Sequence, residues 1–196
     1  AVAHLRRAVE TSSRLGFRQT EAYQLSSLGR AQCSTGDYAA GSATLELSLS
    51  KAAAAGDLRL AALVRIHLGR VRRALGDDAP ARAALEKATA WHREVGGGEL
   101  ASLGECLLAA LDAVDGVPGV EERLESILDE ARTSGEAPVE VFALDALARL
   151  AAVAGHAARA GALSADADRR MPSASYAITE RDRADHLFRR SSSPET

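Results

Sequence analysis

The sequence predicts an all-α chain in which helix pairs stack side by side as a solenoid. Of its 196 residues, 42 are Ala, the best helix former, and only seven are Trp, Tyr or Phe, which favour strands. Glycines recur at nearly fixed spacing, and the segments between them carry apolar residues three and four apart, as amphipathic helices do. Such pairs cannot bury their apolar faces alone, so neighbouring pairs are expected to shield one another.

Two interleaved glycine series divide the chain. Spacings of 40, 40 and 39 residues separate the members of each series, and the series lie half a period apart. Glycine commonly ends a helix in the left-handed conformation, so each of these glycines predicts a turn. The first series is Gly16, Gly56, Gly96 and Gly135, and the second is Gly36, Gly76, Gly116 and Gly155.

These turns bound one leading helix and four helix pairs. The leading helix, residues 1–15, ends at a glycine as the second helix of every later pair does, so it is expected to be half of a truncated unit inside a longer protein. The four pairs are predicted at 18–34 with 38–54, 58–74 with 78–94, 98–114 with 118–133, and 137–154 with 157–170.

The repeat pattern stops after residue 170. Met171 and Pro172 are expected to end the array there, because proline cannot continue a helix and displaces its predecessor from the helical region. We therefore assign the array to residues 1–170, a C-terminal capping helix to 171–190 and a flexible tail to 191–196.

Composition and motifs exclude several function classes. The net charge of −3 gives no basic field, so direct binding of nucleic acid is not expected. The five histidines are scattered, and no serine or cysteine has an identifiable base, so we expect no metal site, no cofactor and no enzyme activity. No signal peptide, disulfide framework or run of about 18 apolar residues is present, which predicts a cytoplasmic protein without a membrane segment.

Small residues recur at set distances from a Leu-Gly pair in the first two repeats. They let one helix approach the next closely, while Leu fills the space between. In the third and fourth repeats Ala109 and Ala148 replace the glycine, and Glu121 stands where the third repeat needs a small residue. The matching positions are Leu28, Gly29, Gly36, Asp37, Gly41 and Ser48 in one repeat, and Leu68, Gly69, Gly76, Asp77, Ala81 and Ala88 in the next.

This pattern resembles the tetratricopeptide repeat, although the unit here is longer than the usual length of about 34 residues. Long units of this kind are similar to the C-terminal regions of large bacterial LuxR-type ATP-binding transcriptional regulators and of the antibiotic regulatory proteins of actinobacteria. The resemblance implies a right-handed superhelix of about four pairs, a leading helix and a C-terminal capping helix.

The same resemblance implies a non-catalytic module that senses a signal by binding. Its partner would be a protein or peptide, another domain of the parent regulator, or a small anionic effector. The alternative is a stand-alone tetratricopeptide scaffold or peptide receptor with no link to transcription. The uncovered end of the array could also support a homodimer.

In the tetratricopeptide register, the first helix of each pair lines the concave face. Three arginines there share one repeat position, and guanidinium groups bind carboxylates in a bidentate manner, which predicts a groove for an acidic partner. The alternative is that these arginines are solvated, with Arg149 paired to Asp145 one turn earlier. The candidate groove residues are Tyr23, Arg30, Arg70, Arg73, Phe142 and Arg149.

Overall fold

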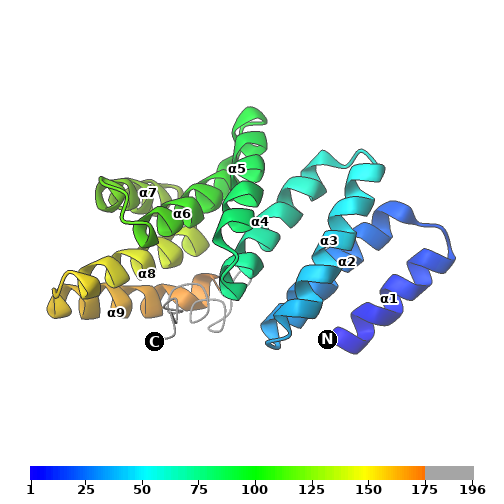
Figure 1. Cartoon of the computed structure of the whole chain (residues 1–196), viewed down its shortest axis with the longest axis horizontal. Helices are drawn as coiled ribbons and strands as arrows, with labels where there is room; N and C mark the ends of the chain where they lie inside the picture. The colour runs from blue at the N-terminus through cyan, green and yellow to red at the C-terminus, as the bar shows by residue number, and fades with distance from the viewer. Residues whose placement is uncertain (175–196) are drawn as a thin grey trace, which may run out of the picture. The chain divides into compact units, whose positions relative to one another are not determined.

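The computed structural model describes residues 1–174, and these residues form nine α-helices and no strand (Figure 1). The all-α prediction is therefore confirmed for this part of the chain. Most predicted helix ends lie within one residue of the observed ones. The helices are α1 (Val2–Arg14), α2 (Arg18–Ser34), α3 (Tyr38–Ala54), α4 (Leu58–Leu75), α5 (Asp78–Glu94), α6 (Gly98–Val114), α7 (Val120–Ser134), α8 (Ala137–Val153) and α9 (Ala157–Ala174).

Two predicted ends are wrong. Helix α7 begins at Val120 instead of residue 118, because Gly119 has a φ of 75°, a left-handed backbone that cannot belong to the helix. Helix α9 continues to Ala174 instead of ending at residue 170. Proline loses one hydrogen bond in a helix, but its fixed φ of about −65° is itself helical. The rest of the predicted cap (171–190) and the tail (191–196) lie outside the described residues.

The periodic glycines lie in the turns between helices, as the spacing predicts. All eight have positive φ, between 70° and 90°. An L-residue with a side chain is strained in this conformation by about 1–2 kcal/mol, so glycine is the residue that these turns require. The turns are only two to five residues long, and consecutive helices within each compact half of the chain therefore run antiparallel, as α1 and α2 do (Figure 1).

The helices form two compact units. The first is Ala1–Trp91, in which α1 packs on α2, α2 on α3 and α3 on α4. The second begins at His92, and in it α6 packs on both α7 and α8, α7 on α8, and α8 on α9. Neighbours in sequence are thus neighbours in space within each unit.

In the first unit, helices cross closely at glycine. A Cβ atom added to Gly29 would lie 2.7 Å from Cγ of Leu45, and one added to Gly69 would lie 2.5 Å from Cγ of Leu85. The two crossings are one repeat apart, so the Leu-Gly landmark reflects a packing requirement that recurs with the repeat.

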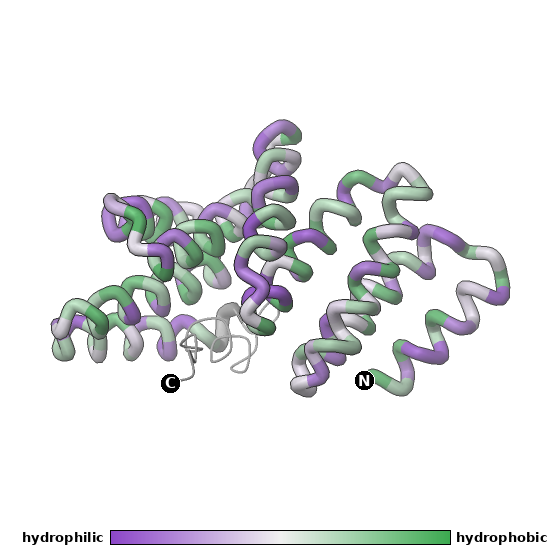
Figure 2. Tube along the Cα trace, in the orientation of Figure 1, coloured by the Kyte–Doolittle hydropathy of each residue, from purple (hydrophilic) through white to green (hydrophobic). Residues whose placement is uncertain are grey.

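Hydrophobic residues are distributed differently along the helices (Figure 2). Helix α1 alternates between polar and apolar turns, whereas α8 is apolar over most of its length, and every residue from 137 to 148 is buried. Even so, no helix within residues 1–174 has both the length and the apolar character needed to cross a membrane.

Candidate functional site

Two of the predicted groove arginines lie near one buried histidine in the first unit. Arg30 is exposed on α2, and Arg70 on α4 is 6% exposed. The positive charges of both act on His67, which precedes Arg70 by almost one turn of α4. Arg30 and Arg70, which are 40 residues apart in the sequence, are therefore both within electrostatic range of His67.

His67 is electrically neutral at pH 7. Burial holds the pKa of this imidazole well below its ordinary value of 6.5, and the charges of Arg30 and Arg70 lower it further. The Nε2 atom of His67 has no hydrogen-bond partner among residues 1–174. Arg30 likewise has no ion pair with any described carboxylate. We call Arg30, His67 and Arg70 the arginine–histidine cluster.

Tyr23 interacts with Asp57 at the start of α4 and is not part of the arginine–histidine cluster. It is 43% exposed and lies about two turns before Arg30 on α2. The carboxylate of Asp57 caps α4 by accepting a hydrogen bond of 2.9 Å from the backbone N–H of Leu60, and it accepts another of 3.0 Å from Gln19. These bonds lower the pKa of Asp57 below its ordinary 3.8, and a hydrogen bond with Tyr23 contributes a smaller effect.

The three remaining predicted groove residues differ in the exposed fraction of their side chains. Arg73, one turn beyond Arg70 on α4, is 9% exposed. Phe142 is 2% exposed, so the prediction that it offers aromatic surface to a groove is wrong; its helix α8 packs against α6, α7 and α9. Arg149 is half-buried on α8 and forms no ion pair with a described residue, so the predicted alternative of a pair with Asp145 is wrong.

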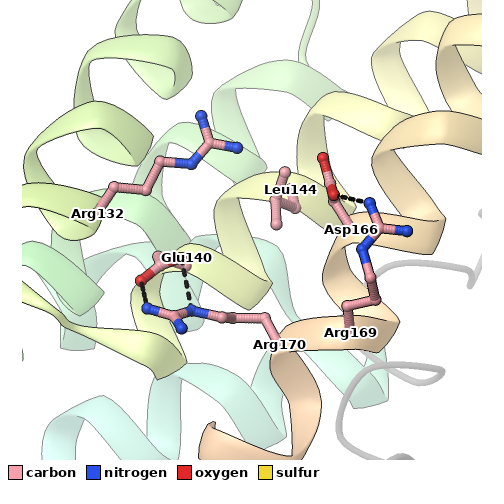
Figure 3. A pocket seen from close by; sticks show the side chains of 6 residues that line it. All are labelled: Arg132, Glu140, Leu144, Asp166, Arg169 and Arg170. Atoms are coloured by element: carbon pink, nitrogen blue, oxygen red, sulfur yellow. Dashed lines mark hydrogen bonds and ion pairs between the residues drawn. The ribbon is translucent and has the colours of Figure 1, made fainter.

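A second candidate site, which the sequence pattern did not reveal, is a pocket within the second unit. It has a volume of about 350 Å³ and is open to solvent. Three helices supply its walls (Figure 3). Its lining residues are Arg132 from α7, Glu140 and Leu144 from α8, and Asp166, Arg169 and Arg170 from α9.

Both carboxylates of this pocket are held by arginines of α9. Arg170 donates two hydrogen bonds to Glu140, of 2.6 and 2.8 Å, and the carboxylate raises the pKa of the Arg170 guanidinium in return. Arg169 pairs with Asp166. On the opposite wall, Arg132 reaches in from α7 (Figure 3).

The Glu140–Arg170 pair has a counterpart in the first unit. Lys51 on α3 donates a hydrogen bond of 3.0 Å to Glu21 on α2, and Glu21 is 7% exposed. Each glutamate precedes its cation by 30 residues, and the two pairs lie 119 residues apart, which equals three repeat spacings. The signal for this cross-link was therefore present in the sequence, as an acid and a base in repeat register.

Searches for potential relatives and metal sites give no further assignment. No protein-family model matches the chain, and no curated protein is similar enough to count as a match. Within residues 1–174, no group of three or more His, Cys, Asp or Glu side chains is placed to hold a metal ion.

Proposed function

We propose that the chain is a right-handed superhelical array of tetratricopeptide-like helix pairs that binds an acidic protein segment without catalysis. We further propose that it serves as the signal-sensing part of a multidomain transcriptional regulator. The regulator role rests on the resemblance of the repeat. The binding role rests on one observation, an exposed Arg30 that forms no ion pair with a described carboxylate, on a helix surface where the charge of Arg70 also acts on His67.

The chemistry of the arginine–histidine cluster favours a carboxylate partner. Arg30 is exposed and has no described carboxylate beside it, so it can bind one without first breaking an ion pair. His67 is buried and neutral, so the positive charge of the cluster comes from Arg30 and Arg70 alone.

Fluorescence anisotropy with two labelled peptides tests the binding role. One peptide alternates Glu with Ala, and the other alternates Lys with Ala. The chain should bind the acidic peptide, and Arg30→Gln should weaken that binding about tenfold or more, because one charge-assisted hydrogen bond contributes about 1.5–3 kcal/mol and 1.4 kcal/mol is about tenfold in affinity. Arg18→Gln removes the same charge from another exposed position of α2 and is the matched control. Equal affinities for the two variants would refute the role of the cluster.

The gene that encodes the chain separates the regulator from the alternative, a stand-alone scaffold or peptide receptor. A nucleotide-binding core or a DNA-binding domain in the same open reading frame supports the regulator. A reading frame that contains the repeat array alone supports the scaffold.

A further inference from the structure

The pocket of the second unit carries more charged side chains than the equivalent positions of the first unit. Two features of the pocket recur in the first helix pair, α2 and α3. The glutamate–cation pair is present there as Glu21–Lys51, and Leu25 is the equivalent of Leu144. Three other lining positions of the pocket have no charged counterpart in the first unit. Arg132, Asp166 and Arg169 correspond, 119 residues earlier, to Ser13, Leu47 and Ser50.

The Glu140–Arg170 pair and its counterpart Glu21–Lys51 are called the framework pairs. A ligand has little access to Glu140 in the first of them. Its side chain is 5% exposed, and both of its oxygens accept hydrogen bonds from Arg170. Removing Arg170 would leave a buried carboxylate unpaired, so we regard this pair as structural. The residues available to a ligand are therefore the two other arginines of the pocket.

Arg132 is held only loosely. Its ion pair with Asp129, three residues earlier on α7, spans 3.7 Å, and the two side chains are 47% and 79% exposed. Exposed pairs of this kind contribute about 0–1 kcal/mol, so an incoming anion displaces Asp129 at little cost. Arg169 is paired with Asp166 at the opposite wall, and both of these side chains are also solvent-exposed.

We infer that this pocket binds a small organic anion, carrying a carboxylate or a phosphate, between the guanidinium groups of Arg132 and Arg169. Figure 3 shows Arg132 on one side, the Asp166–Arg169 pair on the other, and Leu144 between them. A volume of about 350 Å³ accommodates a metabolite and not a folded partner. This inference goes beyond the partner binding proposed for the arginine–histidine cluster and does not depend on it.

Calorimetric titration of the full chain with inorganic phosphate and with malonate, at constant ionic strength, tests the inference. We expect Arg132→Gln and Arg169→Gln each to weaken binding about tenfold, the loss of one charge-assisted contact. The control Arg123→Gln removes the same charge from α7, where Arg123 pairs with Asp112 and does not line the pocket. Arg30→Gln should likewise leave anion binding unchanged, which separates this site from the proposed partner site.

A gain of affinity provides the sharper test. Asp166→Asn frees Arg169 from its carboxylate and removes a negative charge from the pocket, so this variant should bind phosphate several-fold more tightly than the native chain. A purely structural role for the arginines predicts no gain. Absence of phosphate and malonate binding in the native chain would overturn the inference, and so would native affinity in both Arg132→Gln and Arg169→Gln.

Discussion

The first helix pair, α2 with α3, and the last, α8 with α9, are built on the same framework but differ at their helix crossings. Both have a buried glutamate on the first helix that pairs with a cation 30 residues later. They differ at the small positions. Where the first pair has Gly29 opposite Leu45, the last has Ala148 and Ser164 in the same register.

This difference shows how side-chain volume is shared across a crossing. Because Gly29 has no Cβ, it leaves room for Leu45, which a Cβ at this position would contact. Alanine at position 148 is larger, and the residue in the register of that leucine is the smaller Ser164. Ser is smaller than Leu by more than Ala exceeds Gly, so the exchange does not conserve volume. Glycine is therefore required at the first crossing because Leu45 lies against it, and an alanine is tolerated in the last pair, where the residue in that register is short.

Of the substitutions that compare the two pairs, Gly41→Ala should have the largest effect on stability. A Cβ at this position would overlap Sγ of Cys33 and lie 3.0 Å from the carbonyl oxygen of Gly29. We expect the free energy of unfolding, measured by urea titration, to fall by about 1–3 kcal/mol. In the last pair the equivalent residue is already alanine, Ala160. Adding Cys33→Ala should restore part of the loss, and an unchanged stability of Gly41→Ala would disprove the close crossing.

Removing the cation of each framework pair compares the two pairs directly. Lys51→Gln should lower the free energy of unfolding by about 1 kcal/mol and Arg170→Gln by more, because each substitution leaves a buried carboxylate unpaired. The larger effect belongs to Arg170, which donates two hydrogen bonds where Lys51 donates one. Lys87→Gln, at an exposed position of α5, controls for the change of charge. Equal stability of all three variants would show that the cross-link contributes nothing.

The second pair, α4 with α5, contains a buried histidine at a position where the first and last pairs have none. Its His67 is replaced by Ser27 in the first pair and by Ala146 in the last. Since the folded-state pKa of His67 lies well below 6.5, the unfolded chain binds a proton in the range where the folded chain does not. Stability should therefore fall as the pH decreases from about 7.5 through 6.5 to about 5.5.

Urea titrations at several pH values measure this effect. The pH dependence should shrink in His67→Ala, which installs the residue of the last pair, whatever that change does to absolute stability. His156→Gln, at an exposed position before α9, should keep it. The same pH dependence in His67→Ala as in the native chain would contradict the burial of a neutral imidazole.

The sequence predicts the helices far better than the sites, and particular residues show why. Glycine at a turn is required locally, so the spacing of Gly36 and Gly76 was enough to locate helix ends. The burial of Phe142 depends on the three helices that surround α8. A local sequence pattern does not show which helices these are. The pocket was missed because Arg132 and Arg169 belong to separate helices and come together only when α7 and α9 pack around α8.

Gly161→Ala should have the smallest effect and the opposite sign to Gly41→Ala. Gly161 lies inside α9, its φ is not positive, and an added Cβ would meet no atom of residues 1–174 within 4 Å. The first pair carries a side chain at this position, Ser42. Alanine is favoured over glycine in a helix, so the free energy of unfolding should rise by about 0.5–1 kcal/mol. A decrease would mean that another surface approaches α9 at this point.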